Sequence, residues 1–199
     1  MKTYTYLALG DSYTIGEKVL PQENFPNKTA QLLQGIVAAP EIIATTGWTT
    51  DELNTAIDAA NISAQYDFVS LLIGVNNQYR GREVNNFKTT FENLLQRAIA
   101  FSGNRPGHVF VLSIPDWGVT PFAEGRDRKQ IEKEIDDYNI VCKFIAEKCH
   151  TQYIDITASQ RKNGGKDDFL AEDKLHPSAK EYAKWAVQLS AAIQNKINK

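Results

Sequence analysis

Short apolar runs and longer amphipathic segments alternate along the whole chain. The short runs are rich in β-branched and aromatic residues and are bounded by Gly, Pro, Asn or Asp, which predicts β-strands. The predicted strands are Thr3–Leu9, Glu41–Thr45, Asp67–Ile73, His108–Ile114 and Gln152–Ile156. The longer segments repeat apolar residues every three or four positions, as an amphipathic helix does. The predicted helices are Pro26–Gln34, Asp51–Ala60 with Thr50 as N-cap, Glu83–Phe101, Arg126–Lys148 and Ala179–Ile197.

The regular alternation of strand and helix predicts a parallel sheet, because each parallel return needs a crossover longer than a hairpin. Phe68–Ile73 and Val109–Leu112 are almost continuously apolar, as strands buried on both faces are. We therefore expect residues 1–199 to form a single three-layer α/β/α domain of the flavodoxin-like type with about five parallel strands. The longer loops, Pro115–Gly125 and Thr157–Asp173, have room for functional elements.

Composition indicates a globular protein whose partner is a small molecule or another protein. The 199 residues are 42% hydrophobic and 23% charged, which is ordinary for one globular domain. The net charge is −2, from 22 Lys and Arg against 24 Asp and Glu, so nucleic acid and anionic membranes are poor candidate partners. The start of the chain, MKTYTYLALGD, is too polar for a signal peptide, and no apolar run suits a membrane span. These features favour a cytoplasmic protein.

The scarce cysteines and histidines narrow the chemistry. Cys142 and Cys149 lie on one face of a predicted helix, where we expect both to be buried apolar thiols. The three histidines, His108, His150 and His176, are far apart and form no metal-binding motif. We therefore expect no metal site.

Candidate chemistry gathers where ligands bind in open α/β sheets, at the carboxyl ends of the strands. A serine hydroxyl needs an imidazole to take its proton and a carboxylate to orient that imidazole, which predicts Ser12 as nucleophile, His176 as base and Asp173 as orienting acid. The oxyanion of a tetrahedral intermediate needs fixed donors. The backbone N–H groups of Ser12 and Gly47 and the side-chain amide of Asn76 are the candidates.

These residues also form an ordered set of motifs. Gly10-Asp11-Ser12 follows the first strand, Gly47 the second and Gly74-Val75-Asn76 the third, and Asp173-x-x-His176 precedes the last helix. The set resembles the four blocks of the SGNH (GDSL) hydrolases across essentially the whole chain. The resemblance implies a serine ester hydrolase without a cofactor and gives the same roles to Ser12, His176, Asp173, Gly47 and Asn76. The family's substrates include short-chain acyl esters, acetylated carbohydrates and lysophospholipids.

Two positions depart from the family pattern. Tyr13 follows the serine in place of the leucine in the family's short name, and Asn77 stands where many members have Asp. Asp11 is expected to hydrogen-bond the loop backbone rather than act as the triad acid. Further side chains on the same loops are candidates for substrate contacts: Tyr13, Trp48, Asn77, Tyr79, Arg80, Trp117 and Phe122.

Other functions occur on the same type of fold, and the sequence disfavours each of them. A flavin or phosphate binder needs a helix N-terminus directly after the first strand, and Pro21 and Pro26 are expected to delay that helix by about ten residues. A catalytically inactive carbohydrate-binding relative conflicts with the complete set of triad residues. The α/β-hydrolase nucleophile elbow, GxSxG, is excluded because Thr14 occupies its last position.

Overall fold

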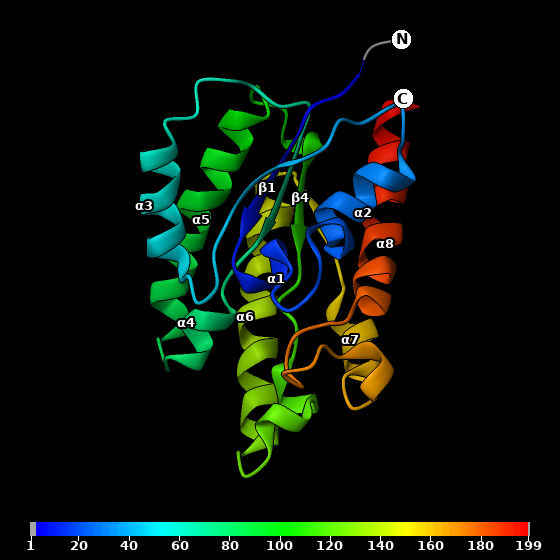
Figure 1. Ribbon diagram of the computed structural model, residues 1–199. Helices are drawn as coiled ribbons and strands as arrows, with labels where there is room; N and C mark the ends of the chain where they lie inside the picture. The colour runs from blue at the N-terminus through cyan, green and yellow to red at the C-terminus, as the bar shows by residue number, and fades with distance from the viewer. Residues whose placement is uncertain (1–2, 199) are drawn as a thin grey trace.

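The fold is built around one five-stranded sheet in which every neighbouring pair of strands is parallel (Figure 1). The structure is a computed structural model and describes residues 3–198. The strand order is β2-β1-β3-β4-β5. The strands are β1 (Tyr6–Gly10), β2 (Glu41–Ala44), β3 (Phe68–Leu72), β4 (Val109–Leu112) and β5 (Gln152–Ile154). The predicted α/β fold with its parallel sheet is confirmed.

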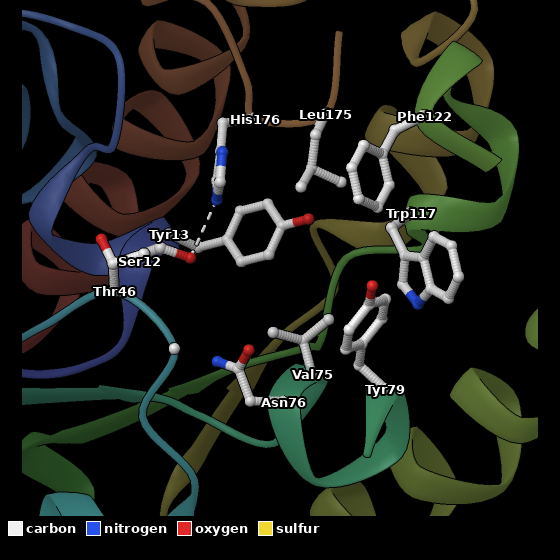
Figure 2. Close-up of a pocket in the computed structure, with 11 residues that line it drawn as sticks. Ser12, Tyr13, Thr46, Val75, Asn76, Tyr79, Trp117, Phe122, Leu175 and His176 are labelled. Carbon is white, nitrogen blue, oxygen red and sulfur yellow. Dashed lines mark hydrogen bonds between the residues drawn. The ribbon is translucent and has the colours of Figure 1, made fainter. Parts of the chain in front are cut away.

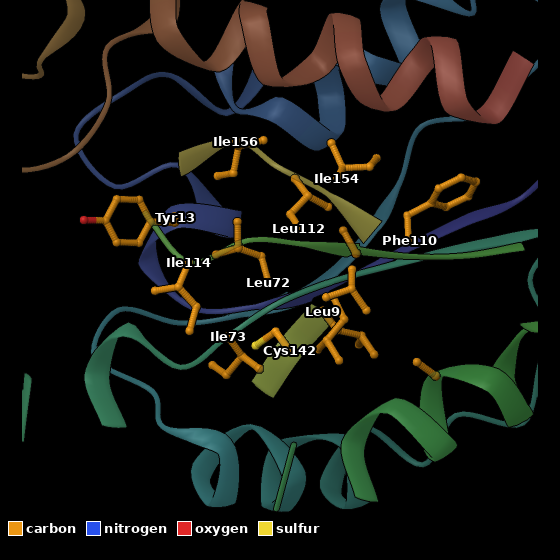
Figure 3. Packing of buried hydrophobic residues seen from close by; sticks show 14 of the residues in the cluster. Leu9, Tyr13, Leu72, Ile73, Phe110, Leu112, Ile114, Cys142, Ile154 and Ile156 are labelled. Carbon is orange, nitrogen blue, oxygen red and sulfur yellow. The ribbon is translucent and has the colours of Figure 1, made fainter. Parts of the chain in front are cut away.

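Helices cover both faces of the sheet (Figures 1 and 3). One layer contains α2 and α8, which pack against each other, and the other contains α3, α5 and α6. The α-helices are α1 (Ser12–Ile15), α2 (Phe25–Leu32), α3 (Thr50–Ala60), α4 (Val75–Tyr79), α5 (Val84–Phe101), α6 (Arg128–Lys148), α7 (Thr157–Asn163) and α8 (Ala179–Ile197). The 3₁₀ helices are η1 (Pro21–Glu23), η2 (Pro106–His108), η3 (Trp117–Val119), η4 (Pro121–Ala123) and η5 (Asp167–Phe169).

Burial explains why the central strands are continuously apolar. Every residue of β1, β3 and β4 is buried, whereas the edge strands β2 and β5 are partly exposed. Side chains such as Leu9, Leu72 and Leu112 fill the space between the sheet and the helices (Figure 3). A strand inside such a sheet has no polar face to offer, so the alternation typical of a half-exposed strand is lost.

The strand order determines where a ligand can bind. The chain runs outward from β1 to β2 and then crosses to β3 on the other side of β1. The loops after β1 and β3 therefore leave the sheet in opposite directions, and a crevice opens between them at the carboxyl ends of the strands. Ser12 and Asn76 lie just after these two strands.

Several local expectations were wrong. A helix does follow the first strand at once: α1 begins at Ser12, because the Asp11 side chain accepts the backbone N–H of Tyr13 and Gly16 ends the turn in the left-handed conformation. The N-cap of α3 is Thr49 rather than Thr50, and its N–H donates to the Glu52 side chain. The two long loops contain the short helices η3, η4, α7 and η5.

The two cysteines lie in different environments. Cys142 is fully buried on α6, and this burial raises the pKa of its thiol. Cys149 follows the last residue of α6 and is only partly buried, with its Sγ accepting a hydrogen bond from Gln96. The expectation of two buried thiols is therefore wrong for Cys149, because the helix ends before that position.

Candidate active site

A cavity of about 190 Å³ opens at the carboxyl ends of the first three strands (Figure 2). Segments that are far apart in the sequence contribute to it: α1, the β2–α3 loop, α4, the region of η3 and η4, and the loop before α8. Its lining residues are Ser12, Tyr13, Thr46, Gly47, Val75, Asn76, Tyr79, Trp117, Phe122, Leu175 and His176. Four of the five predicted triad and oxyanion residues line this cavity. The fifth, Asp173, does not line it but contacts the His176 imidazole.

Ser12 is presented by a sharp turn between β1 and α1. It is the first residue of α1 and is nearly buried. Its Oγ lies 2.9 Å from Nε2 of His176, which is hydrogen-bond distance (Figure 2). An imidazole at this distance can accept the serine proton.

His176 is held by Asp173 through the side chain and the backbone. Oδ2 of Asp173 lies 2.6 Å from Nδ1 of His176, and Oδ1 accepts the backbone N–H groups of Leu175 and His176, each at 3.0 Å. Burial alone would raise the pKa of Asp173, but the hydrogen bonds from His176 and Leu175 outweigh it and lower the pKa below its ordinary value. An ionised Asp173 favours the tautomer that carries a proton on Nδ1, which leaves Nε2 free to accept a proton.

The loop that carries His176 is closed on itself. The backbone N–H of Ala171 donates to the carbonyl of His176 at 2.8 Å, and Lys174 adopts the left-handed conformation with φ of 57°. Leu170 and Pro177 form an isolated antiparallel bridge at the base of this loop. The imidazole therefore projects from a short, hydrogen-bonded turn rather than from a free loop.

Asp11, the carboxylate next to Ser12 in the sequence, contacts the backbone of its own turn. It is fully buried, and its Oδ1 accepts the Tyr13 N–H at 3.0 Å, as expected from the sequence. Burial raises the pKa of Asp11 to about 7 despite this hydrogen bond. Asp11 therefore caps the turn that holds Ser12, while Asp173 contacts the imidazole.

Gly47 and Asn76 line the same cavity from the β2–α3 loop and from α4. Gly47 lies in a turn closed by the Trp48 N–H and the Thr45 carbonyl at 3.3 Å, and its φ of 85° favours glycine. Asn76 lies in the first turn of α4, and its Nδ2 donates to the Trp48 carbonyl at 2.9 Å. An –NH₂ group carries two hydrogens, so Asn76 can donate to this carbonyl and to a ligand at the same time.

Two candidate substrate residues, Arg80 and Asn77, contact the β2–α3 loop and the first turn of α3 instead of lining the cavity. Arg80 Nη2 donates to the Gly47 carbonyl at 2.7 Å, and Nη1 contacts Glu52 at 3.2 Å. Asn77 Oδ1 accepts the Thr50 N–H at 3.1 Å, and its Nδ2 donates to Thr50 Oγ1 at 2.9 Å. These contacts use the polar atoms that the sequence offered as substrate ligands.

Four of the five remaining substrate candidates line the cavity. Tyr13, Tyr79, Trp117 and Phe122 line the cavity, whereas Trp48 lies outside it and packs against the core. Tyr79 and Trp117 meet edge to face at 5.3 Å, and Arg126 lies over both rings. Trp117 is oriented by Gln78, whose Oε1 accepts the indole N–H at 2.8 Å. The far side of the cavity is therefore aromatic and largely apolar.

Sequence reasoning missed three lining residues. Val75 and Leu175 directly precede Asn76 and His176, and Thr46 directly precedes Gly47. A turn that directs a motif residue into a cavity also brings the neighbouring residue to the cavity wall. The position next to a motif residue could therefore have predicted all three.

Other classes of site have little support in the described residues. Between Thr3 and Asn198, no group of three or more His, Cys, Asp or Glu side chains is placed to hold a metal ion. The helix after β1 is only four residues long, and the Asp11 carboxylate already occupies the Tyr13 N–H, so α1 offers no phosphate site of the flavodoxin kind. Within the same range, every helix is too short or too polar to cross a bilayer.

Comparison with known proteins identifies the family. Residues 8–184 match the model of the GDSL-like lipase/acylhydrolase family. The chain belongs to this family and is a hydrolase that acts on ester bonds. No curated protein sequence matches the chain significantly.

Solved structures share the fold at low sequence identity. The esterase EstA from Pseudoalteromonas sp. has a TM-score of 0.75 and 16% identity, with 98% of this chain and 100% of that chain covered. The acetylxylan esterase Axe2 from Geobacillus stearothermophilus has a TM-score of 0.72 and 21% identity, with coverages of 96% and 94%. A lipase/acylhydrolase from Enterococcus faecalis has a TM-score of 0.69 and 22% identity, with coverages of 98% and 97%.

Proposed function

We propose that this protein is a serine esterase that cleaves carboxylic esters through an acyl-enzyme, with Ser12, His176 and Asp173 as its triad. The observation that carries this proposal is the continuous contact from Ser12 Oγ to His176 Nε2, at 2.9 Å, and from His176 Nδ1 to Asp173 Oδ2, at 2.6 Å. A weakly nucleophilic hydroxyl, a base and an orienting carboxylate in this order are what acyl transfer from an ester requires.

The reaction proceeds in two proton-balanced halves. Ser12 Oγ forms a bond to the ester carbonyl carbon as its proton passes to His176 Nε2. The bond from that carbon to the alcohol oxygen then breaks, and the imidazolium returns the proton to the departing alcohol. Water attacks the acyl-enzyme with the same help from His176, which releases the acid and restores Ser12. No cofactor takes part.

The oxyanion of each tetrahedral intermediate is stabilised by the backbone N–H groups of Ser12 and Gly47 and by the side-chain amide of Asn76. These donors are neutral, so they do not titrate near neutral pH. Support for this assignment comes from the position of Gly47 and Asn76 on the cavity wall together with Ser12. The contacts of Asn76 with Trp48 and of Arg80 with Gly47 hold both donors in place.

The preferred substrates are esters of short acyl chains. A cavity of about 190 Å³ is smaller than the pockets that enclose drug-sized ligands, and the aromatic side chains of Tyr79, Trp117 and Phe122 form part of its wall. Tyr79 and Phe122 are also 46% and 43% exposed, so their outer edges lie at the rim, where an alcohol or sugar group can rest.

A substrate panel tests this proposal. Hydrolysis of p-nitrophenyl esters from acetyl to dodecanoyl is measured for the wild type and for Ser12→Ala, together with acetylated xylan and a lysophospholipid. We expect kcat/KM to be highest for acyl chains of a few carbons and Ser12→Ala to lose about 10⁴-fold or more in rate. Activity confined to acetyl groups would indicate a deacetylase of carbohydrates or small molecules, and a preference for the lysophospholipid would contradict the short-chain assignment. Retained activity in folded Ser12→Ala would contradict the mechanism.

A further inference from the structure

The residue after the nucleophile carries a polar atom that the proposed mechanism does not use. Tyr13 stands where the family's short name has leucine, and it is only 2% exposed. Its ring packs beside the His176 imidazole, with 5.2 Å between the ring centroids. Among residues 3–198 its hydroxyl has no hydrogen-bond partner. A buried hydroxyl without a partner is unfavourable, which marks it as a group that a ligand can satisfy.

The Tyr13 hydroxyl points toward the cavity rather than into the core. Tyr13 lines the cavity, and Figure 2 shows its ring extending from beside Ser12 toward Leu175 and Trp117. Figure 3 shows the same ring at the margin of the apolar cluster, with its oxygen directed away from it. Two other polar side chains on this wall already have partners: the Tyr79 hydroxyl accepts a hydrogen bond from Arg126 Nη2 at 3.5 Å, and the Trp117 indole N–H donates to Gln78 Oε1 at 2.8 Å.

The hydroxyl is a hydrogen-bond donor at any working pH. Burial, reinforced by the nearby carboxylates Asp11, Asp173 and Asp116, raises the pKa of Tyr13 well above its ordinary value. A neutral phenol beside apolar walls favours an uncharged acceptor such as an ether, keto or hydroxyl oxygen.

We infer that Tyr13 is a specificity-determining residue that selects acyl groups bearing a hydrogen-bond acceptor oxygen over plain alkyl groups of equal length. This inference rests on the proposed function, because it assigns the cavity to the acyl group of the ester. An all-carbon chain leaves the hydroxyl without a partner, whereas an oxygen within the chain accepts its hydrogen bond. Sites that hydrogen-bond one substrate discriminate strongly against the analogue that lacks the polar atom.

A double ratio of rate constants isolates this effect. p-Nitrophenyl alkanoates are paired with esters of equal chain length in which one methylene, at each successive position from the third chain atom outward, is replaced by oxygen. The ratio of kcat/KM for the oxygenated ester to kcat/KM for the alkyl ester is measured for the wild type and for Tyr13→Phe. Dividing the two ratios cancels the intrinsic reactivity of the esters. We expect the ratio to fall about tenfold in Tyr13→Phe for at least one position of the oxygen.

Tyr182→Phe is the matched control. Tyr182 on α8 is fully buried, and its hydroxyl has no partner among the described residues, but it does not line the cavity. Its replacement removes the same kind of atom from the same protein, so we expect the ratio to stay within about twofold of the wild type. Tyr13→Leu, which installs the leucine of the family's short name, is measured in parallel and should lower the ratio as Tyr13→Phe does. Thermal unfolding of all variants shows which of them fold.

The outcomes separate this inference from the proposed function. An unchanged ratio in whichever Tyr13 variants fold, or an equal change in Tyr182→Phe, overturns the role of Tyr13. If Ser12→Ala is inactive while the ratio does not move, only the specificity role fails. If folded Ser12→Ala remains active on these esters, the proposed function itself fails.

Discussion

The two sides of the active site differ in how far along the chain their supporting contacts reach. Ser12 and His176 are each positioned by a carboxylate within three residues, since Asp11 bonds the Tyr13 N–H and Asp173 bonds Leu175 and His176. Gly47 and Asn76 depend on contacts between the β2–α3 loop and α4, which are 27 to 33 residues apart in the chain. Ser12 and His176 are supported by neighbours in the sequence, whereas Gly47 and Asn76 are supported by contacts between segments that are distant in the sequence.

Contacts that are close in the sequence can be predicted from a single sequence, whereas contacts between distant segments cannot. A spacing such as Asp173-x-x-His176 contains both the functional residue and its support, so the pattern predicts the contact. The sequence around Arg80 and Asn77 contains no such pattern. In a sequence, a polar residue in a loop at the carboxyl end of a strand gives the same signal whether its side chain binds substrate or another loop. Only the sheet order, which sets the loop after β2 and the loop after β3 on either side of β1, brings Gly47 to Arg80.

Removing the imidazole disrupts the locally supported side and should have the largest effect. We predict that His176→Ala lowers kcat about 10⁴-fold, because Ser12 then has no base. Steady-state hydrolysis of the best p-nitrophenyl ester measures this loss, and thermal unfolding checks that the variant folds. A loss below tenfold in folded protein would be incompatible with His176 as the base.

Removing one oxyanion donor should lower kcat less than removing the imidazole does. Asn76→Ala is expected to lower kcat about 10² to 10³-fold with a smaller change in KM, because the amide acts mainly on the charge that develops in the transition state. The measurement is kcat and KM on the same ester. An increase in KM with kcat unchanged would place Asn76 in ground-state binding instead.

Arg80 and Arg82 provide a matched pair for the contacts between the two loops. Both pair with acidic residues of α3, Arg80 with Glu52 and Arg82 with Asp51, but only Arg80 also bonds the Gly47 carbonyl. We predict that Arg80→Ala lowers kcat about tenfold through misplacement of Gly47. Arg82→Ala should change kcat less than twofold, and each variant should lose no more than about 1 kcal/mol of stability. Equal kcat values in the two variants would show that the contact with Gly47 is not needed.

The smallest predicted effect is on stability and concerns Asp11, the N-cap residue of α1. Burial raises the pKa of Asp11 to about 7, above its ordinary value of 3.8, so the folded state holds this proton more tightly than the unfolded chain. The contribution of Asp11 to stability therefore falls as the pH rises from about 4 to about 7. Asp11→Asn keeps an oxygen that can accept the Tyr13 N–H but cannot ionise.

Thermal unfolding at two pH values tests this sign. The melting temperature of Asp11→Asn minus that of the wild type should be more positive at pH 8 than at pH 5. The amide of the variant adds a cost that is the same at both pH values, so only the pH dependence is diagnostic. A difference that stays constant between the two pH values would refute the raised pKa.

The fold itself was largely predictable, and the elements that were missed share one physical cause. Strands buried on both faces and long amphipathic helices leave strong patterns, as in Val109–Leu112 and Ala179–Ile197. The helices α1, α4 and α7 are too short to show a period, and short helices depend on caps and packing rather than propensity. Two of them, α1 and α4, carry Ser12 and Asn76, so the least predictable elements of the fold present two of the side chains to which we assign a role in the proposed mechanism.

Covalent labelling shows whether Ser12 is the nucleophile. An activated alkylphosphonate ester, which reacts with a serine activated by a neighbouring base, is incubated with the wild type and with His176→Ala, and the modified peptide is identified by mass spectrometry. We predict one phosphonyl group per chain on Ser12, loss of esterase activity in proportion to labelling, and far slower labelling of His176→Ala. Complete inactivation with Ser12 unmodified, or full activity with Ser12 modified, would contradict Ser12 as the nucleophile.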